Sequence, residues 1–326
     1  MEKPPVSTDS YKGVRDFYPE DMAVQNYIFS TWRKIVEESG FVEYSASILE
    51  YADLYKSKGN DEIVNEQMYT FTDKGDREVA LRPEMTPSLA RMIAAKRGGL
   101  KLPLRWYSIP NVFRYERPQR GRRREHWQLN CDLMGIPGIE AEVEIITLAH
   151  KIMKAFGAKD EDFVIKINDR RFFDEIFEEI GGASPDTRKE VVRLIDGQEK
   201  NDNFEKELTH ELGEEKKTKF LELLDEKKST ISLDELRNDL DSKGIKNVVI
   251  DTKIARGFDY YTGMIFEVFD TNPENKRSLF GGGRYDNLLE MFGVEPLPTV
   301  GFGMGDITIR DFLETHKLPL TALKNS

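Results

Sequence analysis

The sequence has little cysteine and little histidine: one cysteine, Cys131, and four histidines among 326 residues. A single cysteine excludes a disulfide framework and an all-cysteine zinc site. It also favours a reducing compartment, so we expect a cytoplasmic protein. The histidines, at positions 126, 150, 210 and 316, lack metal-ligand spacing. We therefore expect no metal site built from His or Cys side chains.

Long apolar runs and an excess of positive charge are also missing. No stretch of about 18 apolar residues occurs, which predicts no membrane-spanning helix. Residues 1–20 lack the apolar segment of a secretory signal. Acidic residues outnumber basic residues by 59 to 48, which gives a net charge of -11. This excludes a protein that binds nucleic acid over its whole surface, so any polyanion must meet a local basic patch.

The chain contains many β-forming runs that are separated by turns. Residues 67–72 and 78–82 flank the turn Asp73–Asp76, which predicts a hairpin, and Thr86 can cap a helix over 87–97. Because no succession of strand–helix–strand units occurs, we predict an α+β fold, a mainly antiparallel sheet flanked by helices. Further strands are expected over 41–46, 104–116, 126–134, 163–168, 247–250, 264–269 and 298–304, and further helices over 20–38, 139–156 and 306–315.

The segment 170–245 differs in composition from the rest of the chain. Residues 199–243 hold 23 charged residues in 45, and short helical periodicity of phenylalanine and leucine occurs at 220–224. This pattern predicts a small helical insertion. It divides the chain into 1–169, 170–245 and 246–326.

The run Phe113–Arg124 places six arginines within eleven residues of an acidic protein. A solvated basic loop is the usual interpretation of such a run. Two details favour a binding site instead. Arg114 lies in a β-forming run, where a charge needs a partner, and Pro118 and Gly121 shape the loop so that guanidinium groups can converge. Because the guanidinium fork matches phosphate oxygens, the run favours a triphosphate ligand.

Two weaker patterns also allow purely structural interpretations. Arg256 stands near the paired Tyr260 and Tyr261, as in a lined pocket or in a hairpin with packed tyrosines, and by itself the hairpin is favoured. Glu84 at a strand end can hold an ammonium group or merely favour a helix start, and by itself the helix start is favoured.

Two further patterns concern strand faces and glycines. Gln128, Asn130 and Asp132 alternate on one strand face. That face is either solvent-exposed or, because it follows the arginine loop, a pocket wall. Gly281–Gly283 marks a tight backbone site, but it lacks the spacing of a dinucleotide site and the lysine of a P-loop.

Together these segments resemble the class II aminoacyl-tRNA synthetases, and specifically the histidyl-tRNA synthetase family. The matching segments, in the family's order, are Gly13–Pro19, Leu81–Thr86, Phe113–Gly135, Ala255–Glu267 and Gly281–Leu288. The resemblance implies an antiparallel sheet flanked by helices and a homodimer. It implies that L-histidine is activated with ATP and Mg²⁺ and then transferred to the 3′ end of tRNA(His). It also implies that the helical insertion reaches the tRNA acceptor stem.

The resemblance implies a role for each matching side chain. Arg114 and Arg256 are the catalytic pair at the α-phosphate, Arg122 holds the outer phosphates, and Glu116 contacts the adenine side. The implied histidine-binding set is Glu84, Thr86, Arg114, Gln128, Asp132, Arg256, Tyr260, Tyr261 and Tyr285, and the ATP-binding set is Arg114, Glu116, Arg122 and His126.

Some positions depart from the family's pattern. Asp132 and Asn130 stand where the family often has Glu and Gly, and His126 replaces an aromatic residue that stacks on adenine. Nothing after Leu320 supplies the family's C-terminal anticodon-binding domain, so we expect that domain to be missing.

The last motif departs most. The family's Gly-x-x-x-Gly-x-Glu-Arg keeps its glycines at Gly301 and Gly305, but Ile307 and Thr308 replace the acid and the arginine. Arg310 lies two positions on, which turns it to another face of a helix. We therefore expect ATP to be clamped differently here.

Two other functions stay open at this point. A histidine-sensing, synthetase-like regulatory subunit of ATP phosphoribosyltransferase also lacks the anticodon domain, but it tends to lose the arginines and the insertion that this chain keeps. A plain nucleotide-binding module explains fewer of the residues. We therefore favour a histidine–tRNA ligase.

Overall fold

The computed structural model describes residues 6–57, 63–198, 201–226, 229–254, 260–275 and 277–321. Its centre is a large sheet whose inner strands run antiparallel to one another, as predicted. In spatial order these inner strands are β5 (Leu104–Ser108), β7 (Glu125–Met134), β12 (Thr299–Gly305), β11 (Ser278–Arg284), β10 (Met264–Asp270) and β8 (Phe163–Asp169). The edge strands β1 (Val42–Glu43) and β9 (Val248–Ile250) pair in parallel with β5 and β8.

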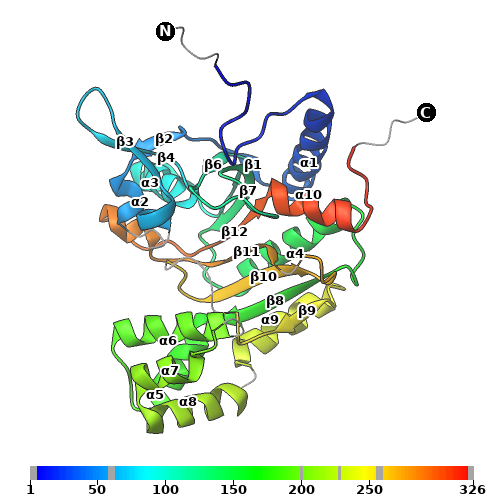
Figure 1. Ribbon diagram of the computed structural model, residues 1–326. Coiled ribbons are helices and arrows are strands. Elements are labelled where there is room, and N and C mark those ends of the chain that lie inside the picture. Colours follow the sequence, from blue (N-terminus) through cyan, green and yellow to red (C-terminus); the bar gives the residue numbers. More distant parts are fainter. Residues whose placement is uncertain are drawn as a thin grey trace.

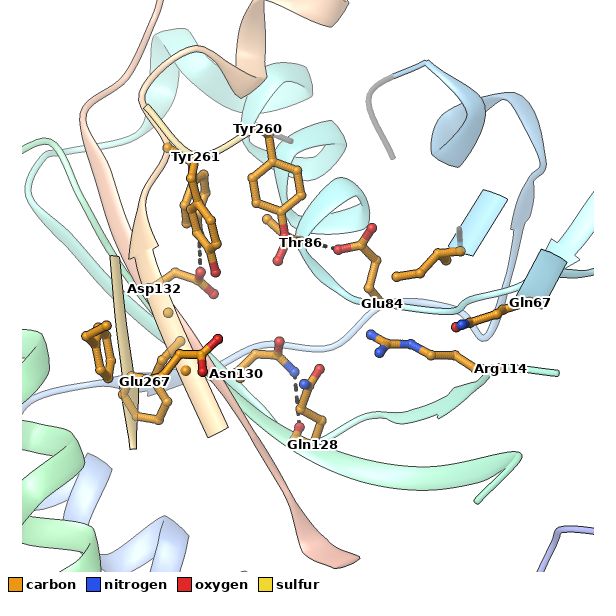
Figure 2. A pocket seen from close by; sticks show the side chains of 18 of the residues that line it. Gln67, Glu84, Thr86, Arg114, Gln128, Asn130, Asp132, Tyr260, Tyr261 and Glu267 are labelled. Carbon is orange, nitrogen blue, oxygen red and sulfur yellow. Dashed lines mark hydrogen bonds between the residues drawn. The ribbon is translucent and has the colours of Figure 1, made fainter. Parts of the chain in front are cut away.

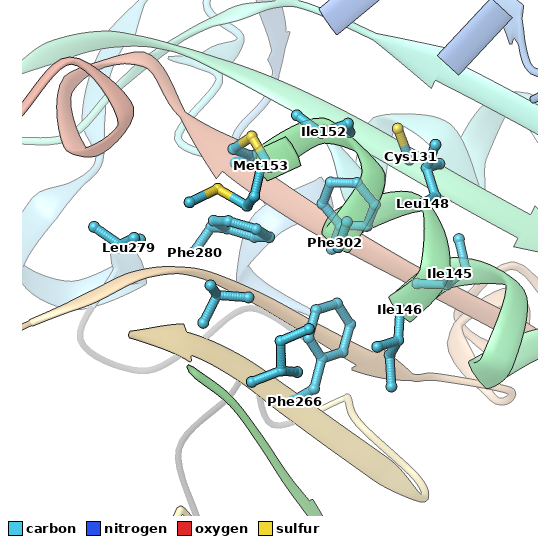
Figure 3. Packing of buried hydrophobic residues seen from close by; sticks show 14 of the residues in the cluster. Cys131, Ile145, Ile146, Leu148, Ile152, Met153, Phe266, Leu279, Phe280 and Phe302 are labelled. Atoms are coloured by element: carbon cyan, nitrogen blue, oxygen red, sulfur yellow. The ribbon is translucent and has the colours of Figure 1, made fainter. Parts of the chain in front are cut away.

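Helices cover one face of this sheet (Figure 1). They are α1 (Pro19–Glu38), α4 (Glu140–Ala155), α9 (Ile231–Ser242) and α10 (Asp306–Thr315). Alternate strand residues such as Cys131, Phe266 and Phe302 point into the core with Ile145 and Ile152 of α4, as Figure 3 shows. The residues between them on the same strands therefore face the opposite side, which the helices leave open.

A second, three-stranded sheet stands beside the first one. It is made of β2 (Leu49–Tyr51), β4 (Glu78–Leu81) and β3 (Tyr69–Thr72), and the predicted hairpin is its β3–β4 pair. The Asp73 carboxylate closes the hairpin turn by accepting from the backbone amides of Gly75 and Arg77. The neighbouring helical elements are α2 (Asp53–Lys56), η1 (Ile63–Gln67), α3 (Thr86–Lys96), η2 (Arg97–Gly99) and η4 (Leu288–Phe292).

Two local predictions were wrong. Thr86 does not cap α3, because Met85 occupies the cap position and Thr86 is already the first helical residue. The predicted strand 104–116 is broken into β5 and β6 (Asn111–Phe113). Pro110, which has no amide hydrogen to donate to the sheet, lies between them.

The predicted insertion contains a hydrophobic core of its own. Its helices α5 (Arg170–Glu179), α6 (Pro185–Gly197), α7 (Phe204–Leu212) and α8 (Glu214–Glu226) gather together below the sheet (Figure 1). Phe172, Phe177 and Phe220 are central members of this core. Helix α9 instead packs against α4, β8 and β9, and its leucines belong to the main core. The division at 169 and 245 stays a prediction.

Candidate active site

A cavity of about 350 Å³ lies on the open face of the main sheet. Figure 2 shows side chains from the large sheet, from α3 and from the segments next to the small sheet, such as Gln67 and Glu84, converging on it. Its lining includes Glu84, Thr86, Arg114, Glu116, Arg122, Gln128, Asp132, Tyr260, Tyr261 and Tyr285. These are the residues expected from the sequence, apart from His126 and Arg256.

Glycines form the floor of the cavity. In one row across four strands, Asn130 pairs with Gly303, Gly303 with Gly281, and Gly281 with Glu267. A Cβ added at Gly303 would collide with the Gln128 side chain, and one at Gly281 would collide with a backbone carbonyl of β10. The central strands therefore leave open space between the polar side chains at the two ends of the row.

Glu84 is placed by the contacts of the residues just before it. Pro83 ends β4 because it cannot donate to the ladder. The Phe113 amide donates to the Arg82 carbonyl at 3.0 Å, and Arg114 Nε donates to the Pro83 carbonyl at 2.9 Å. These bonds join the end of β4 to the end of β6, so Glu84 and Arg114 lie side by side in the cavity.

The Arg82 side chain strengthens this junction. It is 6% exposed, and its guanidinium donates to the Ala46 carbonyl and to both the carbonyl and the side-chain oxygen of Asn111. A buried guanidinium needs such acceptors, and here they come from two segments, at Ala46 and at Asn111. The sequence singled out the motif that contains Arg82 but not this function.

Glu84 is a deeply buried carboxyl with an incomplete set of hydrogen bonds. The Tyr260 hydroxyl donates to Oε2 at 3.1 Å, while Oε1 has no hydrogen-bond partner in the described part of the chain. Burial raises the pKa of Glu84 to about 7, against the opposing effects of Arg114 and the Tyr260 bond. Such a group is suited to bind a cationic donor, which would supply the missing hydrogen bond.

Asp132 is the second buried carboxyl. Its Oδ1 accepts a hydrogen bond from the Tyr285 hydroxyl, and burial raises its pKa to about 7. Tyr260 packs edge-on against Tyr261 and Tyr285, with ring centroids 5.3 and 5.5 Å apart. Burial raises the pKa of all three phenols. This end of the cavity can therefore enclose a small ring whose N–H groups meet oxygen acceptors.

Cationic groups lie at the other end. The Arg114 guanidinium points toward Glu84 (Figure 2), and Arg122 Nη1 forms a 3.0 Å ion pair with Glu116 Oε2. Gln119 and Arg122 exchange two backbone hydrogen bonds across a tight turn. The arginine loop thus reverses direction at this turn, and Arg122 lies in the cavity, where its guanidinium can bind phosphate oxygens.

Two expected residues are not among the described residues that line the cavity. His126 lies on β7 two residues before Gln128 but is not among the lining residues. Burial, with Arg114 and Arg15 nearby, lowers its pKa to about 3, which keeps the imidazole neutral. Arg256 lies outside the described residues. The implied roles of both stay predictions.

Sequence reasoning missed several lining residues. Gln67 is the last residue of η1, whose sequence has no pattern that marks a site. Its backbone carbonyl accepts a hydrogen bond from the Tyr115 amide at 2.6 Å. Glu267 lies in the middle of the apolar run of β10 and faces the cavity (Figure 2). A single carboxylate within an apolar run could have marked Glu267 as a site residue, because a buried charge needs a partner.

No group of three or more His, Cys, Asp or Glu side chains among the described residues is arranged to hold a metal ion. Within the same described ranges, no helix is both long enough and apolar enough to cross a membrane.

Comparisons with known proteins agree with this fold and site. A family model described as Histidyl-tRNA synthetase matches residues 13–306. The histidine–tRNA ligase of Leptospira biflexa is 44% identical, over 98% of this chain and 77% of its own. A histidyl-tRNA synthetase structure from a Nostoc species has a TM-score of 0.79 at 24% identity, covering 97% of this chain and 78% of that one.

A Bacillus halodurans structure is described as an ATP phosphoribosyltransferase regulatory subunit/histidyl-tRNA synthetase. It has a TM-score of 0.80 at 22% identity and covers 95% of this chain and 84% of that one. At such identities the structures show the fold alone, which is that of the class II synthetases.

The chain belongs to the histidyl-tRNA synthetase family. Several curated relatives at 37–44% identity are named histidine–tRNA ligase, and the regulatory-subunit alternative is not favoured.

Proposed function

We propose that this chain is a histidine–tRNA ligase. In the first step a carboxylate oxygen of histidine attacks the α-phosphorus of ATP, and pyrophosphate leaves. In the second step a ribose hydroxyl at the 3′ end of tRNA(His) attacks the carbonyl carbon of histidyl-adenylate, and AMP leaves. The observation that carries the proposal is the convergence of two buried carboxyls, Glu84 and Asp132, with Arg114 in one cavity.

Histidine occupies the tyrosine-lined end of the cavity. Glu84, Thr86 and Gln128 hold its ammonium group, and Asp132 with Tyr260, Tyr261 and Tyr285 surrounds its ring. The unpaired oxygen of Glu84 supports the first assignment, because an ammonium group supplies the donor that this oxygen lacks. The ring assignment rests on the buried Asp132 carboxyl, which can accept from an imidazole N–H.

ATP occupies the arginine end as its Mg²⁺ complex, the ion being part of the substrate. Arg114 and Arg256 neutralise the charge that builds on the α-phosphate oxygens, which lowers the barrier to attack. Arg122 holds the outer phosphates, and Glu116 and His126 lie toward the adenine. The 3.0 Å pair between Arg122 and Glu116 supports this grouping, because it places both at one end of the cavity.

A second copy of the chain covers the outer face of the small sheet. Tyr51, Val79 and Phe71 form one cross-strand row on it, and Tyr51 and Phe71 are 58% and 47% exposed. An apolar row of this kind indicates an interface. The charged insertion, residues 170–245, reaches the acceptor stem of the tRNA. The cytoplasmic location stays a prediction.

The test is histidine-dependent exchange of labelled pyrophosphate into ATP, with the purified chain and an Arg256→Ala control. We expect exchange in the wild type and a loss of more than about 100-fold in the control. If histidine stimulates no exchange above the control, the ligase proposal is wrong.

The dimer is tested by light scattering, which should give twice the mass of the chain for the wild type. Phe71→Glu should give a monomer, and an unchanged dimer in this variant would contradict the assigned face.

A further inference from the structure

The tip of the arginine loop is a tight turn. Gln119 and Arg122 bond to each other through their backbones, and Gly121 between them has φ +76°, as in a type II turn. The last residue of the turn, Arg122, lines the cavity. The position of this turn therefore sets where the Arg122 guanidinium lies.

Helix α10 supplies the surface on which the turn rests. Thr308, Asp311 and Thr315 follow one another on one face of α10, at the spacing that places residues on the same side of a helix. Arg120 Nη2 donates to Thr315 Oγ1 at 2.9 Å. Its Nε donates at 3.2 Å to the side-chain oxygen of Asn275, and Asn275 in turn donates to Thr315 Oγ1 at 3.1 Å.

The turn backbone lies directly over the same helix face. A Cβ added at Gly121 would lie 3.8 Å from Thr308 Cγ2 and 4.0 Å from Asp311 Oδ2. Burial, together with Glu314, raises the pKa of Asp311, while Arg120, the Gly121 amide and Arg123 act in the opposite direction. The two arginines and the amide of the turn therefore favour the charged form of the Asp311 carboxyl.

Thr308 stands where the family's last motif has its arginine, and its small size makes this packing possible. Its hydroxyl donates to the Leu279 carbonyl at 2.6 Å, and its methyl group faces the turn. Arg310 does not replace the arginine, because it pairs with Glu314 and Asp21 on another face of α10. A long side chain at position 308 would occupy the space that the turn fills.

We propose that this α10 face, Thr308–Asp311–Thr315, docks the turn 119–122 and thereby positions Arg122 for ATP. Asp311 and Thr315 are positioning residues, and the docked turn takes the place of the missing arginine as the means of holding the nucleotide. The inference rests on the proposed function and extends it by assigning residues that control ATP binding from outside the cavity.

The first experiment measures the position of the loop without substrates. Limited trypsin digestion followed by mass spectrometry reports cleavage after Arg120, Arg122 and Arg123. We expect cleavage to be about tenfold faster in Asp311→Ala and Thr315→Val, because each loses a bond to the turn. Asp21→Asn, which removes a carboxylate paired with Arg310 on another face of α10, is the matched control and should match the wild type.

The second experiment measures pyrophosphate exchange with the same variants. The KM for ATP should rise about tenfold while the KM for histidine changes less than about twofold. Asp311→Asn keeps an oxygen acceptor for the turn and should recover most of the ATP affinity. Equal changes in both KM values, or faster cleavage with an unchanged ATP KM, would overturn the positioning role.

Thr308→Arg gives an independent test. The added side chain should displace the turn, speed cleavage and raise the KM for ATP. A lower ATP KM without faster cleavage would overturn the inference that the docked turn replaces the arginine. If the wild type shows no exchange, the proposed function fails, and the ATP role of this face fails with it. The cleavage rates still decide by themselves whether the turn docks on α10.

Discussion

The hydroxyl of Tyr260 donates a 3.1 Å hydrogen bond to Glu84 Oε2, although 176 positions separate the two residues in the chain. Both side chains are buried. The bond closes one wall of the cavity and leaves the second oxygen of Glu84 facing the proposed ammonium site.

Tyr260→Phe should weaken histidine binding selectively. Loss of the donor leaves the buried Glu84 carboxyl harder to ionise, so we expect the KM for histidine to rise about tenfold and that for ATP to change less than about twofold. Pyrophosphate exchange at varied substrate concentrations measures both. Tyr18→Phe removes the hydroxyl of an exposed tyrosine and is the matched control. Equal changes in the two KM values would remove Glu84 from the amino-acid site.

Histidine affinity should increase between pH 6 and pH 8. The pKa values of Glu84 and Asp132 lie near 7, and only their ionised forms attract the ammonium group and the ring N–H. We expect a fall of about tenfold in the KM for histidine over this range. Because the substrate ring also titrates near this range, Glu84→Gln and Asp132→Asn are the reference enzymes, and each should show a shallower profile. A profile unchanged in both would contradict the assignment.

Glu84→Gln should stabilise the substrate-free protein at high pH. Because the folded pKa of about 7 exceeds the ordinary value of 4.5, ionisation of Glu84 lowers the free energy of unfolding as the pH rises from 4.5 to 7. The loss then stays constant above pH 7. It amounts to on the order of 1–3 kcal/mol. Thermal melts should give a higher Tm for the variant at pH 8 and similar Tm values at pH 4.5. A variant that is less stable at both would mean that the carboxylate stabilises the fold.

Gly303→Ala should close part of the cavity floor. The new Cβ would lie 2.5 Å from Gln128 Nε2, so the Gln128 side chain must move away from the ammonium site. We expect kcat/KM for histidine to fall about 100-fold, with a loss of about 1–2 kcal/mol in the free energy of unfolding. Gly98→Ala, where nothing lies within 4 Å, is the control. Full activity in Gly303→Ala would show that the substrate does not use this floor.

Phe220→Ala should destabilise the insertion without abolishing the activation of histidine. Phe220 is fully buried in the core formed by α5–α8, apart from the main core, and its loss should cost about 3–5 kcal/mol there. Histidine-dependent exchange should persist while tRNA charging falls. Phe312→Ala, in the main core, should reduce both activities. Loss of exchange in Phe220→Ala would show that the two cores unfold together.

Much of the fold follows from local pattern. The 3.6-residue periodicity of 20–38 and the turn at Asp73–Asp76 each depend on neighbours in the chain, and α1 and the β3–β4 hairpin formed where these predict them. Alternation along β7 likewise put Gln128, Asn130 and Asp132 on one face, and all three line the cavity. Two predictions failed. Pro110, which has no amide hydrogen, divides the strand expected over 104–116, and α3 begins at Thr86, one residue before the expected start.

By itself, therefore, the sequence determined most of the strands, the antiparallel class, the family and most of the side chains of the site, because each of these is carried by periodicity or by a motif a few residues long. It did not predict β11 (Ser278–Arg284), whose three consecutive glycines are poor strand formers. The tertiary structure alone decided which distant groups meet: Tyr260 with Glu84, Gln67 with the arginine loop, and the turn at Gly121 with α10. The physical reason is that such contacts are chosen by burial and by the pairing of polar groups inside the folded core. Neither leaves a trace in the spacing of residues along the chain.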